Sequence, residues 1–191
     1  MEKLVGKLFI ICGVPGSGKT TVQEYLTKNL GFTKVVTHTT RKMRNGEMDG
    51  KDYYFETKES FFENHYLEHV NYDSNYYGSS IEGLKKALSK TNKAVIVLDT
   101  KGVMTYLEKL PKELVTVIYL APPTLAEQKR RLLARGDDKE LVAKRLGSDE
   151  AKRDQTLPKE LVKEAYVLEN NDLKQTYQKL DELVKDICYH N

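Results

Sequence analysis

The segment GVPGSGKT, residues 13–20, has the spacing that most directly predicts chemistry in this sequence. It matches G-x-x-x-x-G-K-[ST], follows an apolar run at 8–12 and precedes a helical pattern at 20–30. In such a loop, glycines let backbone N–H groups surround phosphate oxygens, and the helix N-terminus favours the anion. Because strand and helix patterns flank the motif, a glycine-rich turn without function is the weaker interpretation. The cation of Lys19 is expected to reach the β and γ phosphates, and the hydroxyl of Thr20 suits Mg²⁺.

This loop is therefore the predicted binding site for a donor nucleotide, ATP with Mg²⁺. Lys19 is the predicted catalytic residue of the loop, and Thr20 is the predicted metal ligand. The loop residues expected to contact ATP are Gly13, Val14, Pro15, Gly16, Ser17, Gly18, Lys19, Thr20 and Thr21.

A second candidate for the chemistry is Asp99, which ends the apolar run AVIVLD at 94–99. Phosphate-binding enzymes place a carboxylate near the metal at such a strand end. An aspartate in this position is equally suited to cap the helix that follows, and Thr100 offers a second capping hydroxyl. The local sequence leaves the metal-site and the capping interpretations open.

The remaining pattern indicates how these residues are positioned. Short β-branched, apolar runs predict strands at 8–12, 35–37, 94–98, 116–120 and 166–168. Helices are predicted between most of them: at 20–30 with Gly31 as its terminator, after capping boxes at Ser79/Glu82 and Thr124/Glu127, and at 173–189. The alternation predicts an α/β fold, a parallel sheet with helices on both faces, which binds ligands at the carboxyl ends of its strands.

Two stretches interrupt this alternation. Residues 38–78 are rich in tyrosine, glycine and charge and contain short alternating pieces at 53–55 and 66–72, which predicts a small β-rich insertion. Residues 136–155 are almost wholly polar and predict a mobile helical lid. The predicted organisation is one domain over 1–191, with a core made of 1–37, 79–135 and 156–191.

The composition is that of a globular protein of 191 residues, with 39% hydrophobic and 31% charged residues. A formal net charge of +3, interleaved with acidic residues, does not indicate a nucleic-acid or membrane partner. Cys12 and Cys188 lie near opposite ends and are expected to be reduced. The N-terminal apolar run leads directly into the glycine loop, so it is interpreted as a core strand. These features predict a cytoplasmic location.

The insertion contains THTTRKMRNGEMDGKDYYF at 37–55 and YLEHVNYDSNYYGSS at 66–80. Both strings resemble guanylate kinases. The resemblance continues through IYLAPPTLAEQKRRLLARG at 118–136 and LENNDL at 168–173, so it covers nearly the whole chain in the correct order. The insertion strings are specific to that family among phosphate-loop kinases, whereas the loop motif is not.

The resemblance implies two groups of acceptor-binding residues. Arg41, Arg44, Tyr53 and Tyr77 would clamp the phosphate of GMP, whereas Thr37, Glu68, Ser79 and Asp99 would face its guanine end. Paired arginines are bidentate donors for phosphate, and a carboxylate accepts from both N1–H and the exocyclic amine of guanine. Taken singly, these side chains are better explained as solvated charges or sheet residues than as binding residues. The ordered strings favour the binding interpretation.

The resemblance also implies that Arg135 and Arg145 close on the transferring phosphate, and that Asn170 lies near the adenine, although Asn-Asn-Asp at 170–172 is also a common turn sequence. Together with Lys19 and Arg41 these two arginines are the predicted catalytic residues. Arg130 and Arg131 are equally compatible with a solvated helix face. The arginines of insertion and lid are expected to lack carboxylate partners within the chain.

The implied activity is transfer of the γ-phosphoryl group of Mg·ATP to GMP, giving ADP and GDP. Three positions depart from the family pattern: Thr37 replaces a serine, His38 replaces a small residue, and Lys101 stands in the D-x-Q-G element. The alternatives are a kinase for another nucleoside monophosphate and an inactive binding module of the same family. Inactive modules typically lose the phosphate loop, which is intact here. Small-molecule partners are expected, and the sequence does not determine the oligomeric state.

Overall fold

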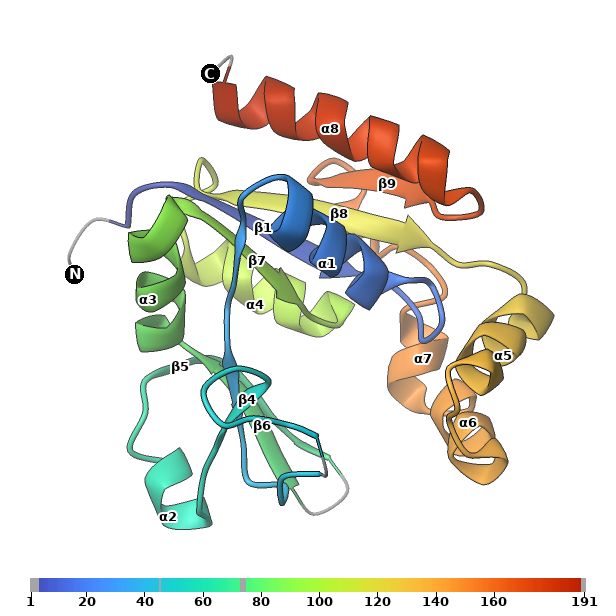
Figure 1. Ribbon diagram of the computed structural model, residues 1–191, viewed down its shortest axis with the longest axis horizontal. Coiled ribbons are helices and arrows are strands. Elements are labelled where there is room, and N and C mark those ends of the chain that lie inside the picture. The colour runs from blue at the N-terminus through green and yellow to red at the C-terminus, as the bar shows by residue number, and fades with distance from the viewer. Residues whose placement is uncertain (1–3, 45, 73–74, 190–191) are drawn as a thin grey trace.

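A computed structural model describes residues 4–44, 46–72 and 75–189 of the chain (Figure 1). Its core is a five-stranded sheet of order β2-β7-β1-β8-β9 in which all neighbours pair in parallel. The strands are β1 (Lys7–Cys12), β2 (Thr33–Lys34), β7 (Lys93–Val97), β8 (Val115–Ala121) and β9 (Ala165–Glu169). The predicted parallel sheet is confirmed.

Helices cover both faces of this sheet (Figure 1). On one face, α1 (Lys19–Asn29) and α8 (Leu173–Tyr189) pack Leu26 and Leu180 against Phe9. On the other, α3 (Ile81–Thr91) and α4 (Thr100–Lys109) pack Leu84 and Tyr106 against Ile10. Successive residues of β1 therefore point into opposite apolar cores, as expected for a strand buried on both sides.

A second, four-stranded sheet of order β4-β3-β6-β5 carries the insertion, which projects from the core beside α3 (Figure 1). Its strands are β3 (Thr37–Thr39), β4 (Tyr53–Phe55), β5 (Tyr66–Tyr72) and β6 (Asn75–Ser80), and α2 (Lys58–Phe61) follows β4. Strand β3, at the start of the insertion, pairs with β4 in parallel and with β6, at its end, in antiparallel orientation. The first and last strands of the insertion are therefore neighbours in its sheet.

The strand predicted at 35–37 is wrong in its placement. The core strand β2 lies earlier, and its ladder ends where the Val35 N–H donates to the Val95 carbonyl at 2.9 Å. Thr37 already belongs to β3 of the second sheet. The apolar pair Val35 and Val36 marks the crossing between two sheets, and periodicity alone does not distinguish a crossing from a strand.

One of the two predicted capping boxes is wrong. Helix α3 is capped by Ser80, whose Oγ accepts from the Gly83 N–H at 3.0 Å, whereas Ser79 faces β5. The buried ring of His38 bridges Ser80 and Glu56, at 2.8 Å from each. The other predicted helix start is correct, because Thr124 accepts from the Glu127 N–H at the start of α5 (Leu125–Ala134), although the Glu127 carboxylate pairs with Arg130 and Arg131 instead of closing a capping box. Adjacent serines carry the same capping propensity, and the strand register decides between them.

Helices α5, α6 (Lys139–Leu146) and α7 (Asp149–Arg153) lie beyond the carboxyl end of β8 (Figure 1). A short 3₁₀ helix (Lys159–Leu161) then leads back to β9. Gly31 terminates α1 in the left-handed region (φ 72°), as predicted. Across the described ranges, none of the helices is long and apolar enough to cross a membrane.

Candidate active site

The predicted phosphate loop connects β1 to α1, at the carboxyl edge of the core sheet. Gly18 is the N-cap of α1 and is left-handed (φ 97°). A Cβ there would lie 2.0 Å from Nδ2 of Asn170, and one at Gly16 would lie 2.9 Å from the Gln128 carbonyl oxygen. Both positions therefore require glycine, because the loop is enclosed by segments from α5 and from the end of β9.

Lys19, the first residue of α1, folds back over the loop. Its Nζ donates to the carbonyl oxygens of Gly13 at 2.5 Å and Val14 at 2.9 Å. Burial lowers the pKa of Lys19 to about 8, and the nearby Asp154 carboxylate opposes this shift. A cation stabilised mainly by neutral oxygens in a desolvated site gains strongly from an arriving phosphate.

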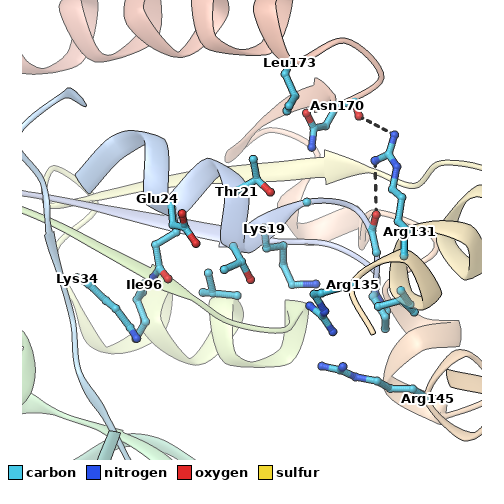
Figure 2. A pocket seen from close by; sticks show the side chains of 18 of the residues that line it. Lys19, Thr21, Glu24, Lys34, Ile96, Arg131, Arg135, Arg145, Asn170 and Leu173 are labelled. Atoms are coloured by element: carbon cyan, nitrogen blue, oxygen red, sulfur yellow. Dashed lines mark hydrogen bonds between the residues drawn. The ribbon is translucent and has the colours of Figure 1, made fainter. Parts of the chain in front are cut away.

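Asn170 and Arg131 brace the loop from two distant segments. The Asn170 amide donates to the Ser17 carbonyl at 2.9 Å, and its own oxygen accepts from Thr176. Arg131 donates to the Asn170 carbonyl at 3.0 Å and reaches the Gly16 carbonyl at 3.5 Å (Figure 2). Arg131 thus ties α5 to the loop, a contact that its place in a basic helical run did not reveal.

Two clefts of about 980 Å³ and about 880 Å³ meet beside this loop. The larger is lined by loop residues and by Arg131 and Asn170, and the smaller by residues of the insertion and lid. Residues common to both clefts are Pro15, Lys19, Tyr53, Val97, Arg135 and Arg145. Figure 2 shows the ends of the Lys19, Arg135 and Arg145 side chains pointing toward one another. Three cations from separate elements therefore lie where the clefts join.

The four residues expected to bind the acceptor phosphate all line the smaller cleft: Arg41, Arg44, Tyr53 and Tyr77. The rings of Tyr53 and Tyr77 lie 6.2 Å apart, and the Arg41 guanidinium lies 5.6 Å from the Tyr53 ring. Glu47 binds Arg41 in a bidentate pair at 3.0 and 2.7 Å, and it also accepts from the Arg44 backbone N–H. One carboxylate thus orients the arginine segment.

Of the four residues expected to face the guanine base, two line the clefts and two do not. Glu68 accepts a 2.9 Å hydrogen bond from the Ser79 hydroxyl, and burial raises the pKa of Glu68. Neither residue lines the two clefts. Thr37 lines the larger cleft and Asp99 the smaller one, and the charge of Asp99 contributes to the raised pKa of Glu68. Glu68 and Ser79 therefore form a pair that does not line either cleft, and the charge of Asp99 acts on it.

Asp99 is the N-cap of α4, which agrees with the capping interpretation. Its Oδ1 accepts from the Gly102 N–H at 2.7 Å, and its Oδ2 pairs with the Arg153 guanidinium at 2.6 Å. Both carboxylate oxygens are thus engaged. Thr100, the alternative cap, donates instead to the buried Asp154 carboxylate at 2.6 Å. The sequence carried no signal for Arg153 or Asp154, because they lie 54 residues from their partners.

Two arginines of the predicted lid segment, Arg135 at its entrance and Arg145 within it, share a carboxylate. Asp137 accepts from Arg135 at 3.1 and 2.5 Å and from Arg145 at 3.4 Å. Arg41 is likewise paired with Glu47. The expectation that the arginines lack partners within the chain is therefore wrong. Gly136 is left-handed (φ 92°) at the end of α5, and this turn places Asp137 against Arg135.

The donor set at the loop is compatible with Mg²⁺ bound together with a nucleotide. Thr20 is exposed in the first turn of α1, and a hydroxyl oxygen beside phosphate oxygens is the hard ligand set that Mg²⁺ prefers. Among the residues described, no group of three or more histidine, cysteine or acidic side chains could hold a metal ion. A metal at this place would therefore take most of its ligands from phosphates and water.

The chain was compared with known proteins. The family model described as guanylate kinase matches residues 5–187. A guanylate kinase of Wolinella succinogenes is 35% identical over 184 residues, covering 92% of this chain and 82% of that protein. One of Streptococcus mutans is 33% identical over 187 residues, covering 94% and 86%. The crystal structure of the guanylate kinase from Anaplasma phagocytophilum superposes with a TM-score of 0.65 at 28% identity, covering 99% of this chain and 89% of that one.

These matches agree with the phosphate loop, the insertion sheet and the two clefts of the structure. The chain belongs to the guanylate kinase family of nucleoside-monophosphate kinases.

Proposed function

We propose that this chain transfers the γ-phosphoryl group of Mg·ATP to GMP, giving ADP and GDP. The observation that carries the proposal is the junction of the two clefts, where Lys19, Arg135 and Arg145 meet. A donor phosphate chain lying along the loop and an acceptor phosphate lying between Arg41 and Tyr77 would approach each other at this junction. Phosphoryl transfer consists largely of such positioning together with compensation of charge on the equatorial oxygens.

Each part of the chain has a distinct task in this reaction. Backbone N–H groups of the loop hold the donor phosphates, and the Lys19 cation compensates charge on the transferred group. Mg²⁺, bound through Thr20, would supply further charge compensation. The Arg41 and Arg44 segment fixes the acceptor phosphate, which is mostly dianionic at pH 7 because its second pKa is about 6. The acceptor oxygen therefore needs no general base from the protein.

The base is recognised by the Glu68 and Ser79 pair. A carboxylate accepts from N1–H and the exocyclic amine of guanine, whereas adenine presents an acceptor at N1. Burial raises the pKa of Glu68 and the Asp99 charge adds to this effect, whereas the Ser79 hydrogen bond and nearby Lys109 act in the opposite direction. The pair does not line either cleft in the structure, so this proposal requires the two side chains to reach the base when GMP binds.

A coupled assay that presents GMP, dGMP, AMP, UMP and CMP with Mg·ATP tests the proposal directly. We expect GMP to be the preferred ribonucleotide acceptor by a factor of at least ~10² in kcat/KM, because mispaired polar groups in a base pocket are strongly rejected. Equal rates with AMP and GMP would contradict the assignment of the base. No transfer to any acceptor would favour a binding module without activity.

We also propose a cytoplasmic location. The structure has Cys12 and Cys188 as free thiols. Burial raises the pKa of the Cys12 thiol to about 12, so this residue remains an unreactive part of the core next to the phosphate loop. Reduced thiols are typical of proteins kept in a reducing compartment.

A further inference from the structure

The side chain of Tyr106, on α4, has a polar atom that the fold leaves unsatisfied. The residue is completely buried, yet its hydroxyl forms no hydrogen bond of ordinary geometry with the described residues. Buried tyrosine hydroxyls nearly always have a partner, because an unpaired polar group in a protein interior is costly. A phenylalanine would fill the same core space without this cost, so the hydroxyl calls for an explanation other than packing.

The position of this hydroxyl points to the base pocket. Burial raises the pKa of the Tyr106 phenol, a hydrogen-bonding contact with Ser79 lowers it and the Glu68 charge raises it, so both residues lie near the hydroxyl. Helix α4 is held against β5 at this place, because Lys109, one turn after Tyr106, donates to the Leu67 carbonyl at 2.6 Å. The raised pKa keeps the phenol protonated at neutral pH, so it is a hydrogen-bond donor there.

Ser79 connects this phenol to the base-binding carboxylate. It is fully buried and donates its only hydroxyl proton to Glu68 at 2.9 Å. Its oxygen keeps lone pairs that can accept from a neighbouring donor. The three side chains thus come from α4, β6 and β5, and they are ordered as phenol, hydroxyl and carboxylate.

We propose that Tyr106 is a specificity-determining positioning residue, whose hydroxyl donates to Ser79 and so holds Ser79 as a donor toward the 6-oxo group of guanine. The proposal rests on the proposed function. When N1–H and the amino group of guanine bind Glu68, the Ser79 proton is released from the carboxylate and turns to the base. The Tyr106 proton then occupies the Ser79 lone pair, which completes a chain of donors that ends at the 6-oxo acceptor.

This chain discriminates against adenine. A Ser79 hydroxyl that accepts from Tyr106 presents its proton to the base, and adenine carries a donor amino group at the 6-position. Two donors would then face each other without an acceptor, a mismatch that buried sites reject strongly. Without the phenol, Ser79 rotates freely and accepts from the amino group as readily as it donates to an oxo group.

The test is Tyr106→Phe, assayed with GMP, inosine monophosphate and AMP. The first two acceptors share the 6-oxo group, and AMP lacks it. We expect KM for GMP and for inosine monophosphate to rise together by roughly three- to tenfold, the range for one neutral hydrogen bond, while kcat and the KM for ATP stay unchanged. KM for AMP should stay constant or fall. Tyr25→Phe, which removes a surface hydroxyl bonded to Asp181 on the opposite face of the sheet, is the matched control.

A Ser79→Ala background locates the effect. If the phenol acts through Ser79, adding Tyr106→Phe to Ser79→Ala changes KM for GMP by less than roughly twofold, because the connecting hydroxyl is already absent. An effect of full size in that background overturns the proposal, as do unchanged KM values for the 6-oxo acceptors or equal changes for all three acceptors. A wild-type enzyme that does not prefer GMP over AMP would instead contradict the proposed function.

Discussion

The donor and acceptor sides of the site hold their cations in different ways. On the donor side, Lys19 is bound by backbone carbonyl oxygens of its own loop, and burial lowers its pKa. On the acceptor and lid side, Arg41 and Arg135 are paired with the carboxylates Glu47 and Asp137. The Lys19 ammonium group is thus held in a desolvated site that favours an incoming anion. The guanidinium groups of Arg41 and Arg135 are instead oriented by ion pairs before any ligand binds. In the proposed reaction, the donor side would gain binding energy from charge, and the acceptor side would gain it from geometry.

The strongest way to break this comparison is to remove the donor cation. Lys19→Met should lower kcat by about 10³-fold or more, because it deletes a desolvated charge aimed at the transferred group. The melting curve followed by circular dichroism should hardly move, since Lys19 is not part of either apolar core. Lys28→Met, on the same helix in an exposed pair with Glu24, is the control. Near-normal turnover in Lys19→Met would contradict the assignment of the phosphate loop.

On the acceptor side the largest effect is expected at the base. Glu68→Gln should lower kcat/KM for GMP by about a hundredfold, because an amide cannot accept from both guanine donors. The KM for ATP should remain within a few fold. Glu63→Gln, an exposed residue of the same insertion, is the matched control. An unchanged ratio of GMP to AMP activity would exclude Glu68 as the residue that selects the base.

A pH titration sharpens the donor half of the comparison. The pKa of Lys19 is lowered to about 8, so its cation is present below this pH and is lost above it. ATP affinity, measured by calorimetry between pH 7 and 9.5, should therefore decrease as pH rises through about 8, by up to roughly tenfold per unit. The ATP affinity of Lys19→Met should not show this decrease above pH 8. A wild-type affinity that is constant to pH 9.5 would show that the loop does not desolvate the cation.

The orientation of Arg41 tests the acceptor half. Glu47→Gln keeps the shape of the side chain but weakens the bidentate pair, in which only 13% of the Arg41 side chain and 20% of Glu47 are exposed. We expect KM for GMP to rise by about tenfold with little change in the KM for ATP, because charged hydrogen bonds in partly buried sites are the stronger ones. A lower KM for GMP would indicate that Glu47 competes with phosphate instead of orienting the arginine.

The smallest effect is expected in the lid. Asp137→Asn weakens a pair in which 54% of the Arg135 side chain is exposed, and exposed pairs contribute only about 0–1 kcal/mol. Activity should change by at most roughly fivefold, and less in high salt. A larger loss than in Glu47→Gln would reverse the order that exposure predicts, and it would mean that the lid, and not the insertion, orients the phosphate-binding arginines.

The parts of the site that the sequence predicted best are those with local causes. The phosphate loop, the cap at Thr124 and the terminator Gly31 depend on residues a few positions apart, and the structure places each as expected. The Ser79 cap and the strand at 35–37 were wrong because neighbouring residues had the same propensity, and the registers of the two sheets selected between them.

The long-range contacts were beyond local patterns. Arg153 pairs with Asp99 across 54 residues, and Asn170 donates to Ser17 across 153. In the sequence, Arg153 is one of several basic residues in a polar stretch. Arg153 meets Asp99 only because the tertiary structure places α7 beside the N-terminus of α4. Likewise, the Glu47 and Asp137 pairs depend on turns whose path a charge pattern does not specify.

The sequence by itself determined the class of fold, the donor loop and the family, because strand and helix periodicity and a motif of fixed spacing act over short distances. The tertiary structure alone decided which charges meet. It brought Lys19, Arg135 and Arg145 to one junction, and it buried the Tyr106 hydroxyl near Ser79 without a hydrogen bond of ordinary geometry to any described residue. The physical reason is that packing sets the distances between segments, whereas the pKa values and partners of polar groups depend on those distances.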